Sequence, residues 1–131
     1  MGDAPSTYAD AVEGIRATIA AYAHALDDGR AEDVVARFCP DGTFDAPGIG
    51  TFEGHDALLE AYRSWAPRRP QRHLVLNTHV SDWSGDEAEA LSDVVMILEG
   101  KDGWGIQFVA RYRDVFHHRD GEWRIHRRTV C

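Results

Sequence analysis

Residues 8–29 read YADAVEGIRATIAAYAHALDDG, and this stretch sets the architecture because it predicts one long amphipathic helix. Its apolar residues recur in steps of three and four, the period of one helix face, over about five turns. Thr7 precedes the stretch as a candidate N-cap, and Gly29 can adopt the left-handed conformation that ends a helix. The apolar stripe consists of Val12, Ile15, Ile19, Tyr22, Ala23 and Leu26.

The predicted helix ends on two adjacent acids, Asp27 and Asp28, although the C-terminal end of a helix carries partial negative charge. On a helical wheel Asp27 lies at the edge of the apolar stripe, beside Ala23. The helix end and the apolar surface both disfavour an ionised carboxylate, which makes such a group a better base near neutral pH. The alternative is that both acids are solvated turn residues before Gly29, and we expect that of Asp28.

The rest of the chain changes from helical to strand patterns after the loop APRRPQR at 66–72. Helices followed by a meander of strands predict an α+β fold with the helices on one face of a curved antiparallel sheet. We expect a single domain over 8–131 after a flexible N-terminus, 1–7. The expected helices after the first cover 31–38 and 55–65, the turn CPDG covers 39–42, 48–54 is irregular, and the expected strands cover 43–46, 73–83, 88–98, 104–117 and 123–130.

Composition narrows the possible partners. The 131 residues include 14 basic and 22 acidic side chains, for a net charge of −8, which argues against nucleic acid. The sequence shows no secretory signal pattern, and no apolar run approaches the roughly 20 residues that span a bilayer. Cys39 and Cys131 form no disulfide framework, so we expect a cytoplasmic protein with reduced thiols and no membrane partner.

The first strand pair predicts which side chains share a face. With Ser84–Gly85 as the turn, His73 lies opposite Met96, Val75 opposite Val94, and Asn77 opposite Ser92. The other face holds Leu74, Leu76, Thr78, Leu91, Val95 and Ile97, with Asp93 among them unless a bulge turns it inward. An antiparallel sheet with one face in water should alternate cleanly, so two apolar faces indicate a second cover. We therefore expect a homodimer through the outer sheet face.

The last hairpin turns at Asp120–Gly121. This turn places Asp114 opposite Arg127 and Tyr112 opposite Thr129, which predicts an ion pair between Asp114 and Arg127 across the strands. Alternatively, Arg127 lines one end of a pocket and binds an anionic group. In the same register Arg128 falls on the other face.

Four motifs in this order resemble the SnoaL-like branch of the nuclear transport factor two-like superfamily: YAHALDDGRAEDVVARFCPDGTFD, RHLVLN, ARYRD and GEWRIHRR. The resemblance covers about residues 11–130. It implies a cone-shaped sheet, of the cystatin-like kind, wrapped around the long helix and enclosing a mostly apolar pocket. Members include polyketide cyclases, scytalone and bile-acid dehydratases, steroid isomerases and the small subunits of ring-hydroxylating dioxygenases, so the site must decide the function.

The resemblance implies a catalytic dyad of Asp27 and His73, with Tyr22 as a hydroxyl donor to a developing oxygen charge. Without the resemblance, a histidine on an apolar face such as His73 is more often a hydrogen-bonded core group than a catalyst, and Tyr22 is equally compatible with an aromatic core residue. We predict that substrate is bound by Asn77, Ser92, Met96, Trp65, Phe108, Tyr112 and Arg127.

The predicted function is a cofactor-independent lyase, isomerase or cyclase acting on a small apolar molecule, such as a polyketide, steroid or terpenoid. We expect no metal, because the pair His117–His118 lacks the spacing of a metal site. The alternative is a non-catalytic module, either a ligand-binding protein or an accessory subunit similar to the dioxygenase small subunit.

Overall fold

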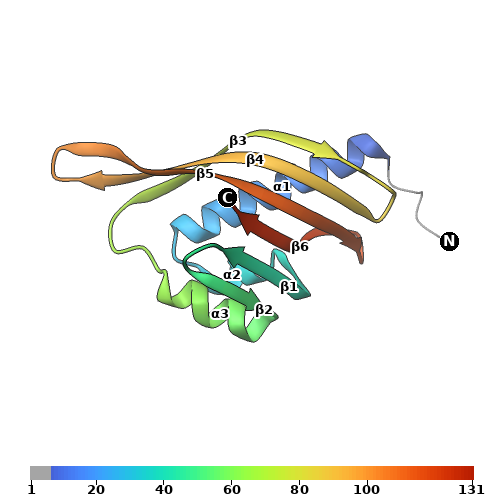
Figure 1. The fold of residues 1–131 in the computed structure, drawn as a ribbon, viewed down its shortest axis with the longest axis horizontal. Coiled ribbons are helices and arrows are strands. Elements are labelled where there is room, and N and C mark those ends of the chain that lie inside the picture. Colours follow the sequence, from blue (N-terminus) through green and yellow to red (C-terminus); the bar gives the residue numbers. More distant parts are fainter. Residues whose placement is uncertain (1–6) are drawn as a thin grey trace.

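The computed structural model describes residues 7–131, which form an α+β fold (Figure 1). Residues 1–6, which make up most of the N-terminus expected to be flexible, lie outside the described part. The α+β class and the curved sheet beside N-terminal helices are confirmed. The helices are α1 (Tyr8–Asp27), α2 (Ala31–Val35) and α3 (His55–Ser64), and the strands are β1 (Phe38–Ala46), β2 (Gly50–Glu53), β3 (Gln71–Ser81), β4 (Glu87–Gly100), β5 (Gly103–Arg119) and β6 (Glu122–Val130).

Helix α1 forms where its sequence pattern predicts. Thr7 begins it with a capping box, in which its hydroxyl accepts from the N–H of Asp10 at 3.1 Å and the Asp10 carboxylate accepts from the N–H of Thr7 at 3.2 Å. Gly29 follows the helix with a φ of 72°, a left-handed conformation that disfavours other residues. The buried face consists of Ala11, Ile15, Thr18, Ile19, Tyr22, Ala23, Ala25 and Leu26.

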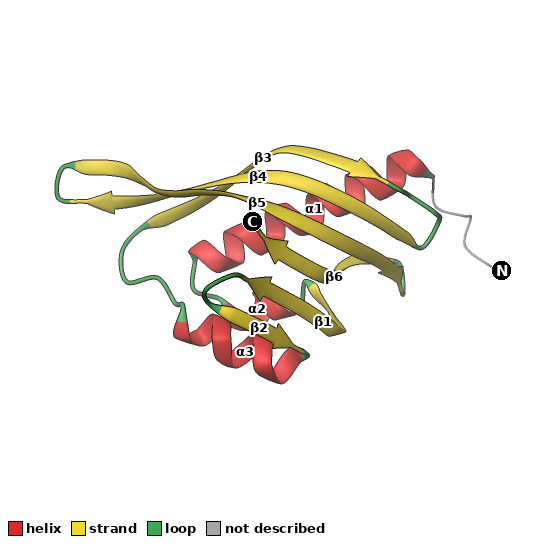
Figure 2. Ribbon diagram, in the orientation of Figure 1, coloured by secondary structure: helices red, strands yellow, loops and turns green. Residues whose placement is uncertain are grey.

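The strands form one sheet in the order β2-β1-β6-β5-β4-β3 (Figure 2). The predicted meander from β3 to β6 is confirmed. The sheet continues beyond β6 with β1, which pairs parallel with β6. Helix α1 packs against β3 and β6, while α3 packs against β1 and β2. The sheet therefore has an inner face toward the helices and an outer face on the opposite side, with β3 as one edge strand.

Four boundaries differ from the prediction, and one of them is the expected turn at 39–42, which lies within β1. The second helix ends at Val35 and not at 38, because Phe38 is buried in β1 and pairs with Ile125 of β6. The region 48–54, predicted to be irregular, contains β2, which pairs with β1. The first hairpin of the meander connects through residues 82–86, a longer loop than the predicted turn at 84–85.

A β-bulge in β3 changes the expected register at Asn77. His73 does lie opposite Met96, and Val75 opposite Val94. Beyond Leu76 the register shifts, and Asn77 has a positive φ of 55°. Its amide donates to Asp93 at 2.9 Å, so the expected Asn77–Ser92 pairing is wrong.

The same bulge turns Thr78 inward. The Thr78 hydroxyl lies 2.9 Å from that of the buried Ser92, so the expected position of Thr78 on the outer face is wrong. Asp93 remains outside, where its carboxylate also accepts from Arg111 at 2.8 Å. One extra residue in β3 therefore exchanged the faces of two polar side chains.

A second bulge decides which arginine enters the core. Between Val115 and Phe116 the β5–β6 register shifts, so that Asp114 pairs with Arg128 and Val115 with Arg127. The expected Asp114–Arg127 ion pair is therefore wrong, and so is the pairing of Tyr112 with Thr129, because Tyr112 lies opposite Val130. A shift of one residue moves a side chain to the opposite face of a strand.

Among the helices of residues 7–131, none combines the length and the apolar composition that a membrane span requires.

The contact between α1 and β6 generates a stability prediction. A Cβ atom on Gly14 would lie 2.6 Å from Cδ1 of the buried Trp123. We expect Gly14→Ala to lower the free energy of unfolding, because overpacking costs about 1–3 kcal/mol. This outweighs the advantage of about 1 kcal/mol that alanine has over glycine in a helix. Urea denaturation measures the change, with Glu13→Ala on the exposed face as control. A stabilised Gly14→Ala variant would contradict this packing.

Candidate active site

A cavity of about 250 Å³ lies between α1, α3 and the inner face of the sheet. Its wall is mostly apolar and aromatic, with a few polar groups at one side, which is the usual composition of a small-molecule site. Tyr22 and Leu26 reach it from α1, and Tyr62 from α3. The remaining lining residues are Phe44, Ala46, Ile49, Trp65, Gln71, His73, Met96, Phe108, Tyr112 and Val130.

The carboxylate of Asp27 binds His73 twice. One oxygen accepts from the backbone N–H of His73 at 2.8 Å, and the other lies 2.7 Å from Nδ1 of the imidazole. Both side chains are nearly buried, with 7% of Asp27 and 10% of His73 exposed. Gln71 donates to the same carboxylate at 3.3 Å. These donors, from the start of β3, offset the negative charge at the end of α1.

This contact fixes the tautomer of His73. An ionised carboxylate only accepts hydrogen bonds, so Nδ1 carries the proton in the neutral ring and Nε2 carries a lone pair. Nε2 makes no hydrogen bond with any residue of 7–131, and His73 forms part of the cavity wall. Phe108 packs edge-on against the ring, with centroids 5.9 Å apart. The imidazole is therefore oriented to accept a proton from a molecule in the cavity.

A pair of tyrosine hydroxyls lies in the same wall. The hydroxyls of Tyr22 and Tyr62 are 2.5 Å apart, and both side chains are buried. Burial raises the pKa of Tyr22 and, more strongly, that of Tyr62, so both phenols stay protonated. One hydroxyl donates to the other, which leaves one O–H of the pair available to a bound molecule.

A buried arginine, Arg128, packs against the rings of Tyr22 and Tyr112. Arg128 is fully buried, and its guanidinium lies 3.8 Å from the ring centroid of Tyr112 and 4.4 Å from that of Tyr22. Asp114 accepts two hydrogen bonds from it, each of 2.8 Å. Burial alone would lower the pKa of Arg128, but Asp114 raises it, so the charge is retained. Its Nη1 is buried and has no hydrogen-bond partner among the described residues.

The structure brings most of the predicted site residues together. His73, Tyr22, Trp65, Met96, Phe108 and Tyr112 line the cavity, and Asp27 supports His73 from behind. Three predicted substrate-binding residues lie elsewhere. Ser92 is buried against Thr78 outside the lining, Asn77 binds Asp93 on the outer face, and Arg127 is half-exposed with its guanidinium 3.5 Å from Asp45.

Sequence reasoning missed other residues of the site. Tyr62 follows the apolar period of the helix over 55–65 and was recognisable as an inward-facing phenol. No comparable pattern in the sequence indicates Gln71, which precedes the expected strand, or Arg128, whose inward position depends on the bulge in β6. Phe44, Ala46 and Ile49 belong to the first half, where the strand boundaries were wrong.

Comparisons with known proteins agree with the fold. The sequence profile of the SnoaL-like domain matches residues 7–129. A protein of unknown function from Mycobacterium tuberculosis has a similar structure, with a TM-score of 0.86 and 28% identity over 92% of this chain and 70% of that one. A search of curated proteins gave no significant match.

Two structures from Novosphingobium aromaticivorans are also similar, each 25% identical to this chain. A putative aromatic ring hydroxylase has a TM-score of 0.84, with 95% of this chain and 90% of that one covered. A putative scytalone dehydratase has a TM-score of 0.80, with 92% of this chain and 82% of that one covered.

The buried pair behind the tyrosines generates a second prediction. Asp114→Ala should lower the free energy of unfolding by about 3–5 kcal/mol, because it leaves the Arg128 charge buried and unpaired. The double variant Asp114→Ala/Arg128→Met should recover most of that loss, because it removes the charge as well. Chemical denaturation measures both variants.

The matched control is Glu32→Ala, which breaks the exposed pair with Arg63 and should leave the free energy of unfolding almost unchanged, because exposed ion pairs contribute little. If Asp114→Ala lowered the free energy of unfolding as little as this control does, burial of the Arg128 guanidinium would not depend on its pairing with Asp114.

Proposed function

This chain belongs to the SnoaL-like domain family, and from that premise we propose that it is a cofactor-independent lyase, isomerase or cyclase for a small, largely apolar molecule. The observation that carries the proposal is the Asp27–His73 pair, whose 2.7 Å contact directs an unprotonated Nε2 to a largely apolar cavity. A free base beside an aromatic wall is suited to proton transfer from carbon.

In the proposed reaction, Nε2 of His73 removes a proton from a carbon next to a carbonyl group. The C–H electrons form a carbon–carbon double bond, and the carbonyl electrons move to oxygen. Asp27 stabilises the imidazolium that results. The O–H of the Tyr22–Tyr62 pair donates to the developing oxygen charge. The imidazolium then returns the proton to another carbon in an isomerisation, or to a departing hydroxyl as water in a dehydration.

The cavity limits the proposed substrate. Its volume of about 250 Å³ is below the range of about 300–1,000 Å³ that is usual for drug-sized ligands. We therefore propose a molecule of one or two rings with a carbonyl or hydroxyl group at one end. The putative scytalone dehydratase and the putative aromatic ring hydroxylase among the similar structures are consistent with a ring-containing substrate.

The competing proposal is a non-catalytic ligand-binding protein or accessory subunit. It predicts a cavity filled by side chains, or an Asp27–His73 separation beyond hydrogen-bond reach. The open cavity and the 2.7 Å contact favour the catalytic proposal.

The dyad generates the third prediction. Asp27→Asn and His73→Ala should each slow turnover by about 10²–10⁴-fold, because each removes the oriented base. Since the substrate is unidentified, the assay is NMR-detected exchange of carbon-bound hydrogen for deuterium in a panel of small cyclic ketones and hydroxyketones. The control is Asp28→Asn, the same change at the next residue, which is exposed. Full exchange activity in a folded His73→Ala protein would exclude the dyad as the base.

We also propose that a second copy of the chain covers the outer sheet face, as the sequence analysis expected. Leu74 and Leu76 are exposed on β3, and Val109 on β5 is 68% exposed. Val95, between Leu74 and Val109 in the register, belongs to the same apolar row. An apolar surface of this kind is typical of a protein interface.

The fourth prediction follows from that face. The wild-type chain should sediment as a dimer, and Val109→Asp should shift it to a monomer, because the new carboxylate would be buried without a partner. Analytical ultracentrifugation measures the mass. Glu60→Lys on the exposed side of α3 is the control and should leave the dimer intact. A wild-type monomer at high concentration would refute the dimer and leave the proposed chemistry untouched.

A further inference from the structure

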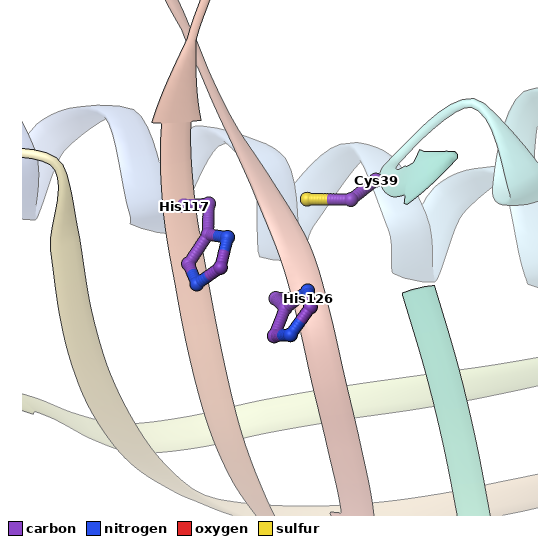
Figure 3. A group of neighbouring side chains, drawn as sticks. All are labelled: Cys39, His117 and His126. Atoms are coloured by element: carbon purple, nitrogen blue, oxygen red, sulfur yellow. The ribbon is translucent and has the colours of Figure 1, made fainter. Parts of the chain in front are cut away.

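We propose that Cys39, His117 and His126 form a binding site for a zinc-like divalent metal ion on the outer face of the sheet, independent of the cavity. The three side chains come from β1, β5 and β6, which are neighbours in the sheet, and they converge in Figure 3. The Cys39 Sγ and one nitrogen from each imidazole lie within 4.8 Å of one another. None of the three lines the cavity.

Two irregularities in the sheet create the cluster. The β1–β6 register shifts between Phe38 and Thr43, so the segment 39–42 departs from regular pairing and places Cys39 beside β6. His126 lies in the β6 bulge, between Ile125 and Arg127. The sequence could not show this site, because Cys39 is far from both histidines and their positions depend on the bulge.

The hydrogen bonds of His117 suit a metal ligand. Arg119 lies 2.8 Å from Nδ1, and a guanidinium only donates, so Nδ1 carries a lone pair. Nε2 therefore carries the proton and donates to Glu87 at 3.1 Å. A carboxylate that accepts the second N–H of a histidine is the usual support of a metal-bound imidazole.

His126 supplies an unused polar atom. Its Nδ1 is buried and has no hydrogen-bond partner within residues 7–131. The carboxylate of Asp41 lies beside the cluster, with its Oδ1 3.8 Å from this nitrogen. We assign Asp41 as the fourth ligand. One thiolate, two imidazoles and one carboxylate form a tetrahedral donor set that favours zinc over magnesium or calcium.

Binding requires a small rearrangement. Zinc bonds of about 2.0–2.3 Å place tetrahedral ligand atoms about 3.3–3.8 Å apart, so the cluster must contract from its present 4.8 Å limit. The two imidazole rings now stack with centroids 4.0 Å apart and must rotate, because a metal lies in the plane of each ring. Arg119, half-exposed and 3.7 Å from Asp41, must turn outward from the place that the cation would take.

The test uses cobalt(II) as a spectroscopic substitute for zinc, with the tag-free, reduced protein. Wild type should bind one equivalent and show the thiolate-to-cobalt charge-transfer band and the intense visible bands of a tetrahedral site, and zinc should displace the cobalt. Cys39→Ser should abolish the charge-transfer band, and His126→Asn should abolish the tetrahedral spectrum. Cys131→Ser and His118→Gln are matched controls that should change neither.

Two further variants test the supporting residues. Glu87→Gln should weaken zinc affinity by about 10–100-fold, as loss of such a supporting carboxylate usually does. Arg119→Gln should strengthen it, because the competing cation is removed. Both are measured by competition with a chromophoric chelator.

The proposal is overturned if wild type gives no thiolate-to-cobalt band, or if the band persists in Cys39→Ser and disappears in Cys131→Ser. It is also overturned if Glu87→Gln and Arg119→Gln both leave the affinity unchanged.

Discussion

The carboxylate of Asp27 joins the last turn of α1 to the first residues of β3, and the cavity depends on that junction. The helix end is an unfavourable place for an acid, but the N–H groups of His73 and the amide of Gln71 compensate it. Because one oxygen holds the backbone and the other holds the ring, the position of the strand and the orientation of the imidazole are fixed by the same group. The same interaction therefore attaches β3 to α1 and orients the imidazole of His73.

A second polar assembly, Arg128 with Asp114, supports tyrosines that line the cavity. Arg128 keeps its charge because Asp114 pairs with it in a bidentate contact, and its guanidinium packs against the rings of Tyr112 and Tyr22. Desolvation keeps the phenols protonated while the cation makes them better donors. The cavity lining thus contains a proton acceptor, His73, and a proton donor, the tyrosine pair, among mostly apolar side chains.

The periodicity of apolar residues along the chain correctly predicted α1 and the strands of the meander, because both depend mainly on nearby residues. The stripe of α1, its Thr7 cap and the Gly29 stop were sufficient to place the helix, and the alternating strands predicted the meander. The helix end and the strand start drew attention to Asp27 and His73, and the resemblance to the SnoaL-like family singled them out together with Tyr22. Their roles remain predictions.

The errors of strand register came from single inserted residues. The bulge at Asn77 moved Thr78 inward, and the bulge that contains His126 placed Arg128, and not Arg127, against Asp114. A bulge depends on how two strands fit together and not on the composition of either, so alternation alone could not reveal it. The same insertion placed His126 beside Cys39 and His117.

The two ends of α1 both attach to β3, where the Tyr8 hydroxyl donates to the carbonyl of Val80 at 2.8 Å and Asp27 accepts from His73. An edge strand normally offers its open backbone groups to any extended chain, which can begin fibrous aggregation. Here α1 already occupies one backbone group near each end of this edge, which leaves fewer open groups for an incoming strand. The opposite edge, β2, spans just Gly50–Glu53 and offers little length for pairing. The Asp27–His73 contact that we propose for catalysis therefore also occupies part of the longer edge of the sheet.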